Sequence, residues 1–158
     1  MGKRRQGVNR QMRYIILSLL IFATFSTMAQ QPKDICVQHD SYIEIAMKDA
    51  MLNESGIDIK LVNNQKTSII LLSKTKVGPI FSTQLAKRDQ INSGANPRKM
   101  TRKDYSSTYT DGNVYNLIVK FTFEDNAGKE NIFIGSAFRN DDECSVGFGG
   151  YITVERGF

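Results

Sequence analysis

The chain has 158 residues, with 21 Lys and Arg against 16 Asp and Glu, which gives a formal net charge of +5. Five of the basic residues lie before residue 14 and no acidic residue precedes residue 30, so the chain from residue 30 onward carries 16 of each and is net neutral. This neutrality argues against a nucleic acid as partner, because nucleic-acid-binding domains carry an excess of positive charge.

Residues 1–29 have the pattern of a cleavable signal peptide. Basic residues precede an apolar stretch from Tyr14 to Phe25, and the small residues Thr27 and Ala29 then provide a cleavage site. An uncleaved anchor is the alternative, but the apolar stretch is shorter than the roughly 20 residues of a spanning helix. We therefore expect a secreted or periplasmic protein with no stable membrane span, made of one domain over residues 30–158.

The next feature is a cysteine, Cys36, whose only possible partner is Cys144 near the other end of the chain. An even number of cysteines in an exported chain most simply forms disulfides. The sequence therefore predicts a Cys36–Cys144 disulfide that ties the first mature segment to the last strand.

Residues 41–54 have the pattern of an amphipathic helix. Ser41 and Glu44 have the spacing of a capping box, and Gly56 can end the helix in the left-handed conformation. The apolar residues recur at spacings of three and four, at Ile43, Ala46, Met47, Ala50 and Met51.

Two short apolar segments follow, at residues 57–61 and 67–73, with a polar turn between them. This pattern predicts a β-hairpin. The run 69–72 is apolar at every position, which indicates a central strand or a strand covered on both faces.

Residues 84–113 form a long polar insertion with no sustained period, although a short helix over residues 82–91 fits the pattern. Connections of this length in compact domains are commonly functional or mobile. We therefore treat the insertion as the first candidate for a functional segment.

The C-terminal third predicts an antiparallel meander of three strands over residues 114–124, 131–138 and 144–154. In the first of these strands the apolar residues alternate, and in the last strand Gly147, Gly149 and Gly150 suggest a bulge. The whole chain is therefore expected to be an α+β domain, with one N-terminal helix packed on a curved antiparallel sheet of about five strands. An all-β sandwich with a decorating helix is the alternative.

Few residues suggest chemistry. Cys36 and His39 could form a nucleophilic pair or half of a metal site, but Cys36 has a disulfide partner and the chain has no second histidine. The acidic run 141–143 could bind calcium, but its spacing differs from that of an EF-hand loop, and a solvated turn is the simpler interpretation. We expect no catalytic residue, no metal and no cofactor.

Charge is distributed in blocks along the chain. Residues 60–103 hold ten basic residues and one acidic residue, whereas residues 104–158 hold four basic and nine acidic residues. The basic block could neutralise the acidic strands within the fold. Alternatively, an exposed basic and aromatic loop could dock an acidic protein partner. The candidate residues for that loop are Arg98, Lys99, Arg102, Lys103, Tyr105 and Tyr109.

These observations favour a non-enzymatic exported module that recognises a protein through the 84–113 insertion, as a small inhibitor or immunity-type protein would. The alternative is a small-molecule carrier or small enzyme with a pocket between helix and sheet, lined by Met47, Met51, Phe121 and Phe148. The sequence identifies neither the partner nor the oligomeric state.

Overall fold

The structure, a computed structural model, describes residues 33–93 and 100–158. The predicted signal peptide and two of the candidate docking residues, Arg98 and Lys99, lie outside the described residues. The elements are α2 (Tyr42–Ser55), β1 (Ser68–Lys76), α3 (Pro79–Asn92), α4 (Arg102–Thr110), β2 (Tyr115–Glu124), β3 (Glu130–Arg139) and β4 (Gly147–Arg156).

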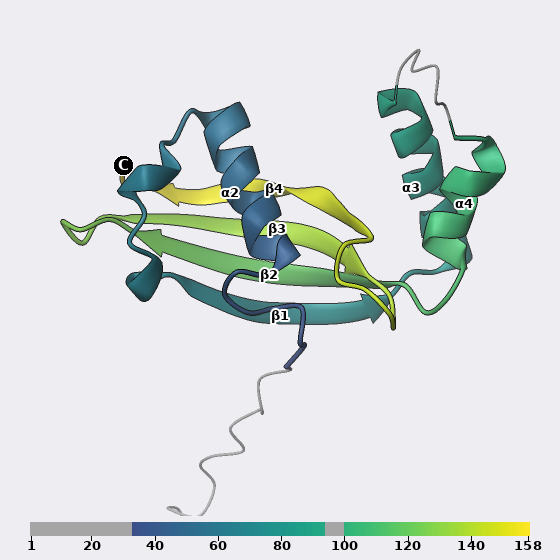
Figure 1. The fold of residues 1–158 in the computed structure, drawn as a ribbon, viewed down its shortest axis with the longest axis horizontal. Coiled ribbons are helices and arrows are strands. Elements are labelled where there is room, and N and C mark those ends of the chain that lie inside the picture. The colour runs from purple at the N-terminus through teal and green to yellow at the C-terminus, as the bar shows by residue number, and fades with distance from the viewer. Residues whose placement is uncertain (1–32, 94–99) are drawn as a thin grey trace, which may run out of the picture. The chain divides into compact units, whose positions relative to one another are not determined.

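The predicted α+β class is confirmed. The four strands form one antiparallel sheet in the order β1-β2-β3-β4, and α2 crosses one face of it (Figure 1). The sheet has four strands rather than the expected five. The α3 and α4 helices form a hairpin inserted between β1 and β2, so the hairpin extends from the end of the sheet where β1 stops.

The α2 helix begins and ends where the sequence predicts. Ser41 is the N-cap and its hydroxyl accepts from the Glu44 amide at 3.4 Å, while Gly56 adopts φ 66°. The capping box differs in one respect, because the Glu44 carboxylate accepts from the Asp40 amide at 2.7 Å rather than from the N-cap amide. This carboxylate is buried, and Lys48 one turn later pairs with it at 2.7 Å.

The core lies between α2 and the sheet, and the alternation in β2 builds it. Four side chains of β2 are fully buried against α2, and the residues between them point to the opposite face. The four are Leu117, Val119, Phe121 and Phe123. They pack with apolar residues of α2 and β3, including Ile43, Met47, Met51 and Phe133.

The predicted strand at residues 57–61 is wrong. Residues Ile59–Leu61 form a single 3-10 turn, because the Asp58 side chain accepts from the Lys60 amide at 2.9 Å and bends the backbone. The Asn63 side chain starts a second such turn in the same way. No hairpin with β1 forms in this part of the described chain.

The prediction that the 69–72 run is central or covered on both faces is also wrong. Strand β1 lies at the edge of the sheet, and Leu72 is 46% exposed. Only Leu71 of the run is buried, against the α2 face. A register shift between Leu71 and Ser73 leaves Leu72 outside the regular pairing, which is why the run does not alternate.

The bulge predicted in the last strand is confirmed. The pairing of β3 with β4 shifts register between Ser136 and Ala137, opposite Gly149 and Gly150. Gly150 has φ 105°, and a Cβ atom on Gly149 would lie 2.8 Å from the Ser136 hydroxyl oxygen. Glycine is therefore needed here for a positive φ and for a close approach of side chains from β3.

Candidate interaction surface on the α3–α4 hairpin

Two helices occupy most of the insertion that the sequence suggested was largely irregular. Pro79 begins α3 at its first turn, and Thr101 caps α4. The Asp104 carboxylate accepts from the Thr101 amide at 2.7 Å, while the Thr101 hydroxyl accepts from the Asp104 amide at 3.2 Å. These hydrogen bonds to Thr101 hold the pKa of Asp104 below its ordinary value. At the base, the Val77 amide donates to the Val114 carbonyl at 2.9 Å, which joins the two ends of the insertion.

Tyr105 and Tyr109 are not exposed, so this part of the predicted docking loop is wrong. Their exposed fractions are 9% and 3%, because both side chains fill the space between α3 and α4. Leu85 and Ala86 of α3 complete this small core, and Phe138 of β3 closes it against the sheet. The tyrosines lie four residues apart on one face of α4, so they hold the hairpin together.

A polar network at the hairpin core fixes Tyr109. Its hydroxyl donates to the Asp89 carboxylate, and Arg88 Nε donates to the same carboxylate at 3.0 Å. The Tyr109 ring packs edge-on against the Phe138 ring at 5.7 Å. Burial, together with the bond to Asp89, raises the pKa of the Tyr109 hydroxyl. Tyr109 therefore stays a neutral donor that links α3, α4 and the sheet.

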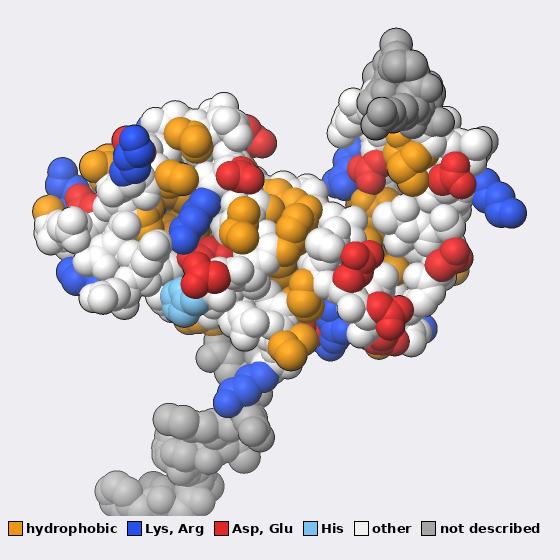
Figure 2. All heavy atoms as spheres, viewed as in Figure 1, with side chains coloured by type: hydrophobic (Ala, Val, Ile, Leu, Met, Phe, Trp, Pro, Cys, Tyr) orange, Lys and Arg blue, Asp and Glu red, His pale blue; other side chains and the backbone are white. Residues whose placement is uncertain are grey.

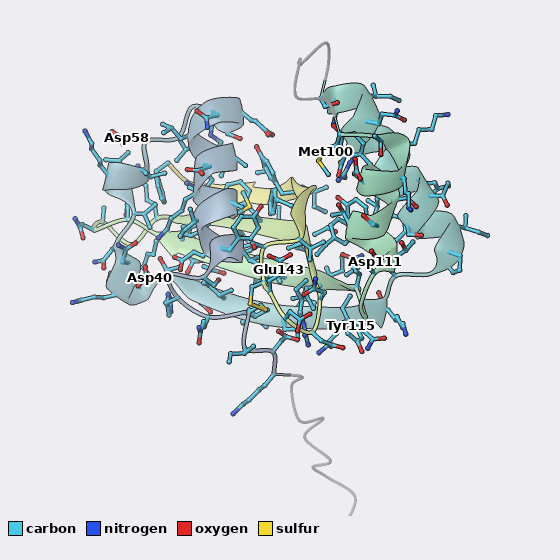
Figure 3. All side chains as sticks on the ribbon, turned by 45° about the vertical axis from the view of Figure 1, so that its right-hand side comes forward. Asp40, Asp58, Met100, Asp111, Tyr115 and Glu143 are labelled. Carbon is cyan, nitrogen blue, oxygen red and sulfur yellow. A yellow bond between two sulfur atoms is a disulfide. The ribbon has the colours of Figure 1, made fainter. Side chains whose placement is uncertain are left out.

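The basic candidates are distributed differently from the tyrosines. Lys103 is exposed in the first turn of α4, and Arg102 is the first residue of that helix. Figure 3 shows Met100 and Asp111 at the two ends of α4, with Tyr115 where the chain enters the sheet. Arg98 and Lys99 lie outside the described residues. Lys103 is therefore exposed on the surface of α4, whereas both tyrosines are buried.

Sequence reasoning missed an exposed stripe on α3, which we call the α3 stripe. Its members are Ile80, Gln84, Lys87, Arg88 and Ile91. Their spacing places them on one side of the helix, opposite Leu85 and Ala86. Ile80 and Ile91 are 79% and 67% exposed, and a shallow depression of about 300 Å³ is lined by Gln84, Lys87, Arg88, Ile91 and Asn92. The short helix that the sequence suggested over residues 82–91 is therefore present within α3, and Pro79 was the signal for its earlier start.

One part of the basic block forms ion pairs within the fold, and another part remains available to a partner. Lysines that precede the insertion neutralise acids of the fold, because Lys66 pairs with Glu124 and Lys74 pairs with Asp34 at 2.8 Å. Lys87 and Lys103 make no ion pair within the described residues. Internal neutralisation is therefore the role of the earlier part of the block.

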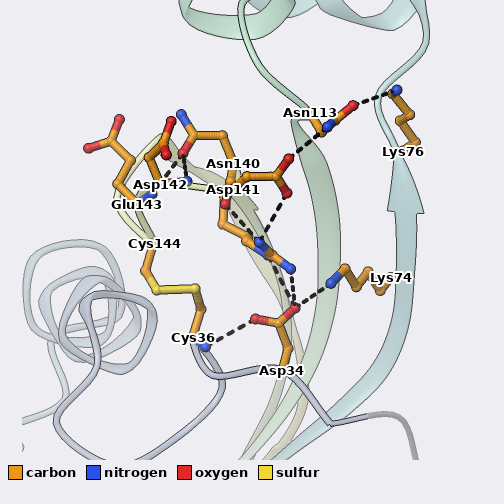
Figure 4. Close-up of polar contacts among 11 residues, drawn as sticks. Asp34, Cys36, Lys74, Lys76, Asn113, Asn140, Asp141, Asp142, Glu143 and Cys144 are labelled. Carbon is orange, nitrogen blue, oxygen red and sulfur yellow. Dashed lines mark hydrogen bonds and ion pairs between the residues drawn. A yellow bond between two sulfur atoms is a disulfide. The ribbon is translucent and has the colours of Figure 1, made fainter.

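The predicted disulfide is present and lies beside a buried ion cluster (Figure 4). The Cα atoms of Cys36 and Cys144 are 5.4 Å apart. The Asp34 carboxylate, 1% exposed, accepts from Arg139 at 2.9 and 3.1 Å, from Lys74 at 2.8 Å and from the Cys36 amide at 3.0 Å. Burial alone would raise the pKa of Asp34, but the bonds to Lys74, the Cys36 amide and Arg139 outweigh it and lower that pKa.

The residues that suggested catalysis or metal binding have other places in the structure. Cys36 is in the disulfide, so it cannot form a nucleophilic pair with His39, whose side chain is 56% exposed. The acidic run 141–143 is a turn, in which Asn140 Oδ1 accepts from the Asp142 amide at 2.9 Å and the Glu143 amide at 2.7 Å. No group of three or more metal-ligating side chains comes together in the part of the chain that the structure describes.

The space between helix and sheet is filled. Met47, Met51 and Phe121 have no exposed surface and belong to the core. Phe148 instead lines an open hollow of about 310 Å³ beside α2, together with Tyr42, Ile45 and Asp49 among others. Figure 2 shows hydrophobic side chains gathered in the hollow between α2 and the hairpin. The hollow is open to solvent.

Comparisons with known protein families, with curated proteins and with solved structures find no significant match to this chain. Among the described residues, no helix combines the length and the apolar character needed to cross a membrane. The function therefore has to be inferred from the geometry of the chain itself.

Proposed function

We propose that this chain is an exported, non-enzymatic module that binds a protein partner through the α3–α4 hairpin. The observation that carries the proposal is the α3 stripe, in which two highly exposed isoleucines flank two cations and a shallow depression lies at the Ile91 end. Most isolated exposed isoleucines need no explanation, but apolar side chains combined with cations on one helix face form a surface suited to a partner.

The chemistry of the stripe indicates the kind of partner. Lys87 and Arg88 favour an acidic surface, and Ile80 and Ile91 favour an apolar contact within it. Tyr105 and Tyr109 are buried between the two helices and hold α3 and α4 together, and a capping box fixes the start of α4. A preorganised surface loses little conformational entropy on binding, which suits an inhibitor or immunity-type role.

The carrier or enzyme alternative receives less support. It needs a pocket between helix and sheet, and Met47, Met51 and Phe121 fill that space. The open hollow that Phe148 lines is bordered by Asp49 and Glu54, but no described basic residue converges on it.

The test compares variants of the α3 stripe with a matched variant on α2. The chain is expressed with its leader in the native host, and proteins bound to it in the exported fraction are quantified by mass spectrometry. Lys87→Glu combined with Ile91→Asp should reduce recovery of the specific partner at least about tenfold, because both charge and apolar contact are lost.

The control is Ile45→Asp, which alters an isoleucine of α2 that is 50% exposed. It should leave recovery of the partner unchanged. Equal losses in the two variants would contradict the proposal, as would a partner whose recovery neither variant alters. Circular dichroism confirms that each variant is folded.

A further inference from the structure

The face of the sheet opposite α2 is unusually apolar. The strand register places five isoleucine side chains on it, which we call the isoleucine face. Its members are Ile70, Ile118, Ile132, Ile134 and Ile152. A solvated face of an antiparallel sheet normally carries polar residues, so this face departs from the usual alternation.

The side chains of the isoleucine face remain accessible to solvent. Ile152 is 62% exposed, and the other four members are partly exposed. Leu72 and Val154, the unpaired residues at two register shifts, are 46% and 56% exposed. On the same strand as Ile118, the neighbours Leu117 and Val119 have no exposed surface. No described element therefore covers this face except at one end, where the α3–α4 hairpin packs on Phe138.

We propose that a second copy of this chain covers the isoleucine face, so that two sheets pack face to face in a symmetric dimer. Antiparallel sheets pack in this way about 10 Å apart, with interdigitated aliphatic side chains. The β-branched residues that dominate this face fit such a pleated surface. The two α2 helices would then lie on the outside of a four-layer assembly.

The size of the face approaches what a stable dimer needs. With strands about 4.8 Å apart and residues about 3.3 Å apart, four strands by about seven residues cover roughly 450 Å² in projection. Because side chains project from the sheet, the accessible area of the face is larger than its projected area. It therefore approaches the roughly 800 Å² per partner of a standard stable interface. One small peptide would leave much of the face exposed.

Its composition also favours a second copy over an unrelated protein. Apart from the covered Phe138, no aromatic residue or arginine lies on this face among the described residues. These residue types dominate the binding energy in complexes between different proteins. Permanent homodimer interfaces are instead more hydrophobic.

The charged residues on this face are compatible with self-association. Lys120 lies between Ile70 and Ile134 in the register, and Glu130 and Glu155 lie toward one end of the face. None of these three makes an ion pair within the described residues. In a symmetric interface the same patch meets itself, so a face with both signs of charge can complement its own copy.

The experiment measures oligomeric state. The full chain is expressed with its leader, recovered from the exported fraction, and studied by sedimentation velocity and light scattering over a wide range of concentration. The wild type should show a concentration-dependent dimer. Ile152→Lys should raise the dissociation constant at least about a hundredfold, since it places an unpaired charge in an apolar interface.

The matched control is Ile45→Lys, on the opposite side of the molecule, which should dimerise like the wild type. A photo-crosslinking residue in place of Ile152 should link to peptides of the isoleucine face in a second copy. A wild-type protein that is monomeric at every concentration would overturn the proposal, whether or not Ile152→Lys folds. Links to α2 would overturn it as well, and so would an equal loss of dimer in the control.

Discussion

Asp34 is the residue that anchors the N-terminal segment to the sheet. Its buried carboxylate binds Lys74 of β1 and Arg139 of β3. Both cations also lie over the Tyr115 ring, at 4.7 and 5.0 Å from its centroid. One carboxylate thus joins three segments that are far apart in the chain.

We expect Asp34→Asn to lower the free energy of unfolding at neutral pH by about 2 kcal/mol, because Lys74 and Arg139 lose the buried carboxylate that pairs with both. The folded state lowers the pKa of Asp34 from its ordinary 3.8. The ionised form therefore stabilises the fold above about pH 4, and this contribution disappears as the pH falls toward the lower folded pKa. Denaturant titrations should show that the difference between wild type and variant narrows below about pH 4. A difference that does not change with pH would contradict the assignment.

Gly149 permits the close approach of β4 to β3 beside the hairpin. We expect Gly149→Ala to destabilise the protein by about 1–3 kcal/mol, because the new Cβ would lie 2.8 Å from Ser136 Oγ and 3.1 Å from a ring carbon of Phe138. Ser136 cannot turn away without cost, since its hydroxyl donates to Asn116 at 2.7 Å.

The matched control for Gly149 is Gly78→Ala, which has φ −85° and no atom within 4 Å of the added Cβ. It should lower the free energy of unfolding by no more than about 1 kcal/mol, because the site is open and the only expected cost is that of alanine at the N-cap of α3. Thermal unfolding of both variants checks the pair. Equal destabilisation would mean that the close approach at Gly149 is not the cause.

At the scale of elements, the local sequence pattern predicts α2 well and the helices of the insertion poorly. The α2 helix has caps at both ends and a clear apolar face, so its limits follow from the sequence. In α3, apolar residues lie on both sides, with Leu85 inward and Ile80 and Ile91 outward, and this obscures the period. For α4, the capping box at Thr101 and Asp104 was a signal that the sequence interpretation did not use.

A variant of the hairpin tests whether the basic insertion docks a partner or neutralises acids within the fold. We expect the quadruple variant Arg98→Glu, Lys99→Glu, Arg102→Glu and Lys103→Glu to keep the wild-type melting temperature. Glu124 of the acidic strand β2 already has Lys66 as its partner, and glutamate in the first turn of α4 is favoured by the helix dipole.

The same quadruple variant should bind the protein partner more weakly, and association of the wild type should slow with added salt. Differential scanning calorimetry and binding kinetics measure the two effects. A variant that melts early and binds without salt dependence would instead support internal neutralisation.

At the scale of the whole molecule, the disulfide and Asp34 join the start of the described chain to the loop between β3 and β4. Cys36 and Cys144 are 108 residues apart in sequence, so the bridge closes nearly the whole domain into one loop. Such a loop contributes up to about 4–5 kcal/mol in the chain-entropy model. If the proposed dimer forms, it carries two hairpins, and a partner with repeated sites would bind with added avidity.

The start of the exported protein is a prediction at this scale. We expect intact mass spectrometry of exported material to give a chain that begins at Gln30 or Gln31. A cut after Ala29 leaves Asp34 and Cys36, which are anchored in the fold, in the mature chain. A mass that retains residues 12–29 would indicate an anchor instead.

The sequence by itself determined features that depend on local order along the chain. These are the leader pattern, the α2 helix with its caps, the alternation of β2 and the pairing of the two cysteines, which had no other choice of partner. It also determined that a bulge lies among the glycines of β4, because close packing there requires a missing side chain.

Only the tertiary structure decided which surfaces are covered. Periodicity identifies the faces of an element, but it does not say what packs against each face. Tyr105 and Tyr109 are buried because α3 folds back on them, and Ile59–Leu61 turns rather than pairing because side chains bend its backbone. The 69–72 run lies at the sheet edge, and Ile134 and Ile152 lie on a face without a covering layer, since no described element reaches across it.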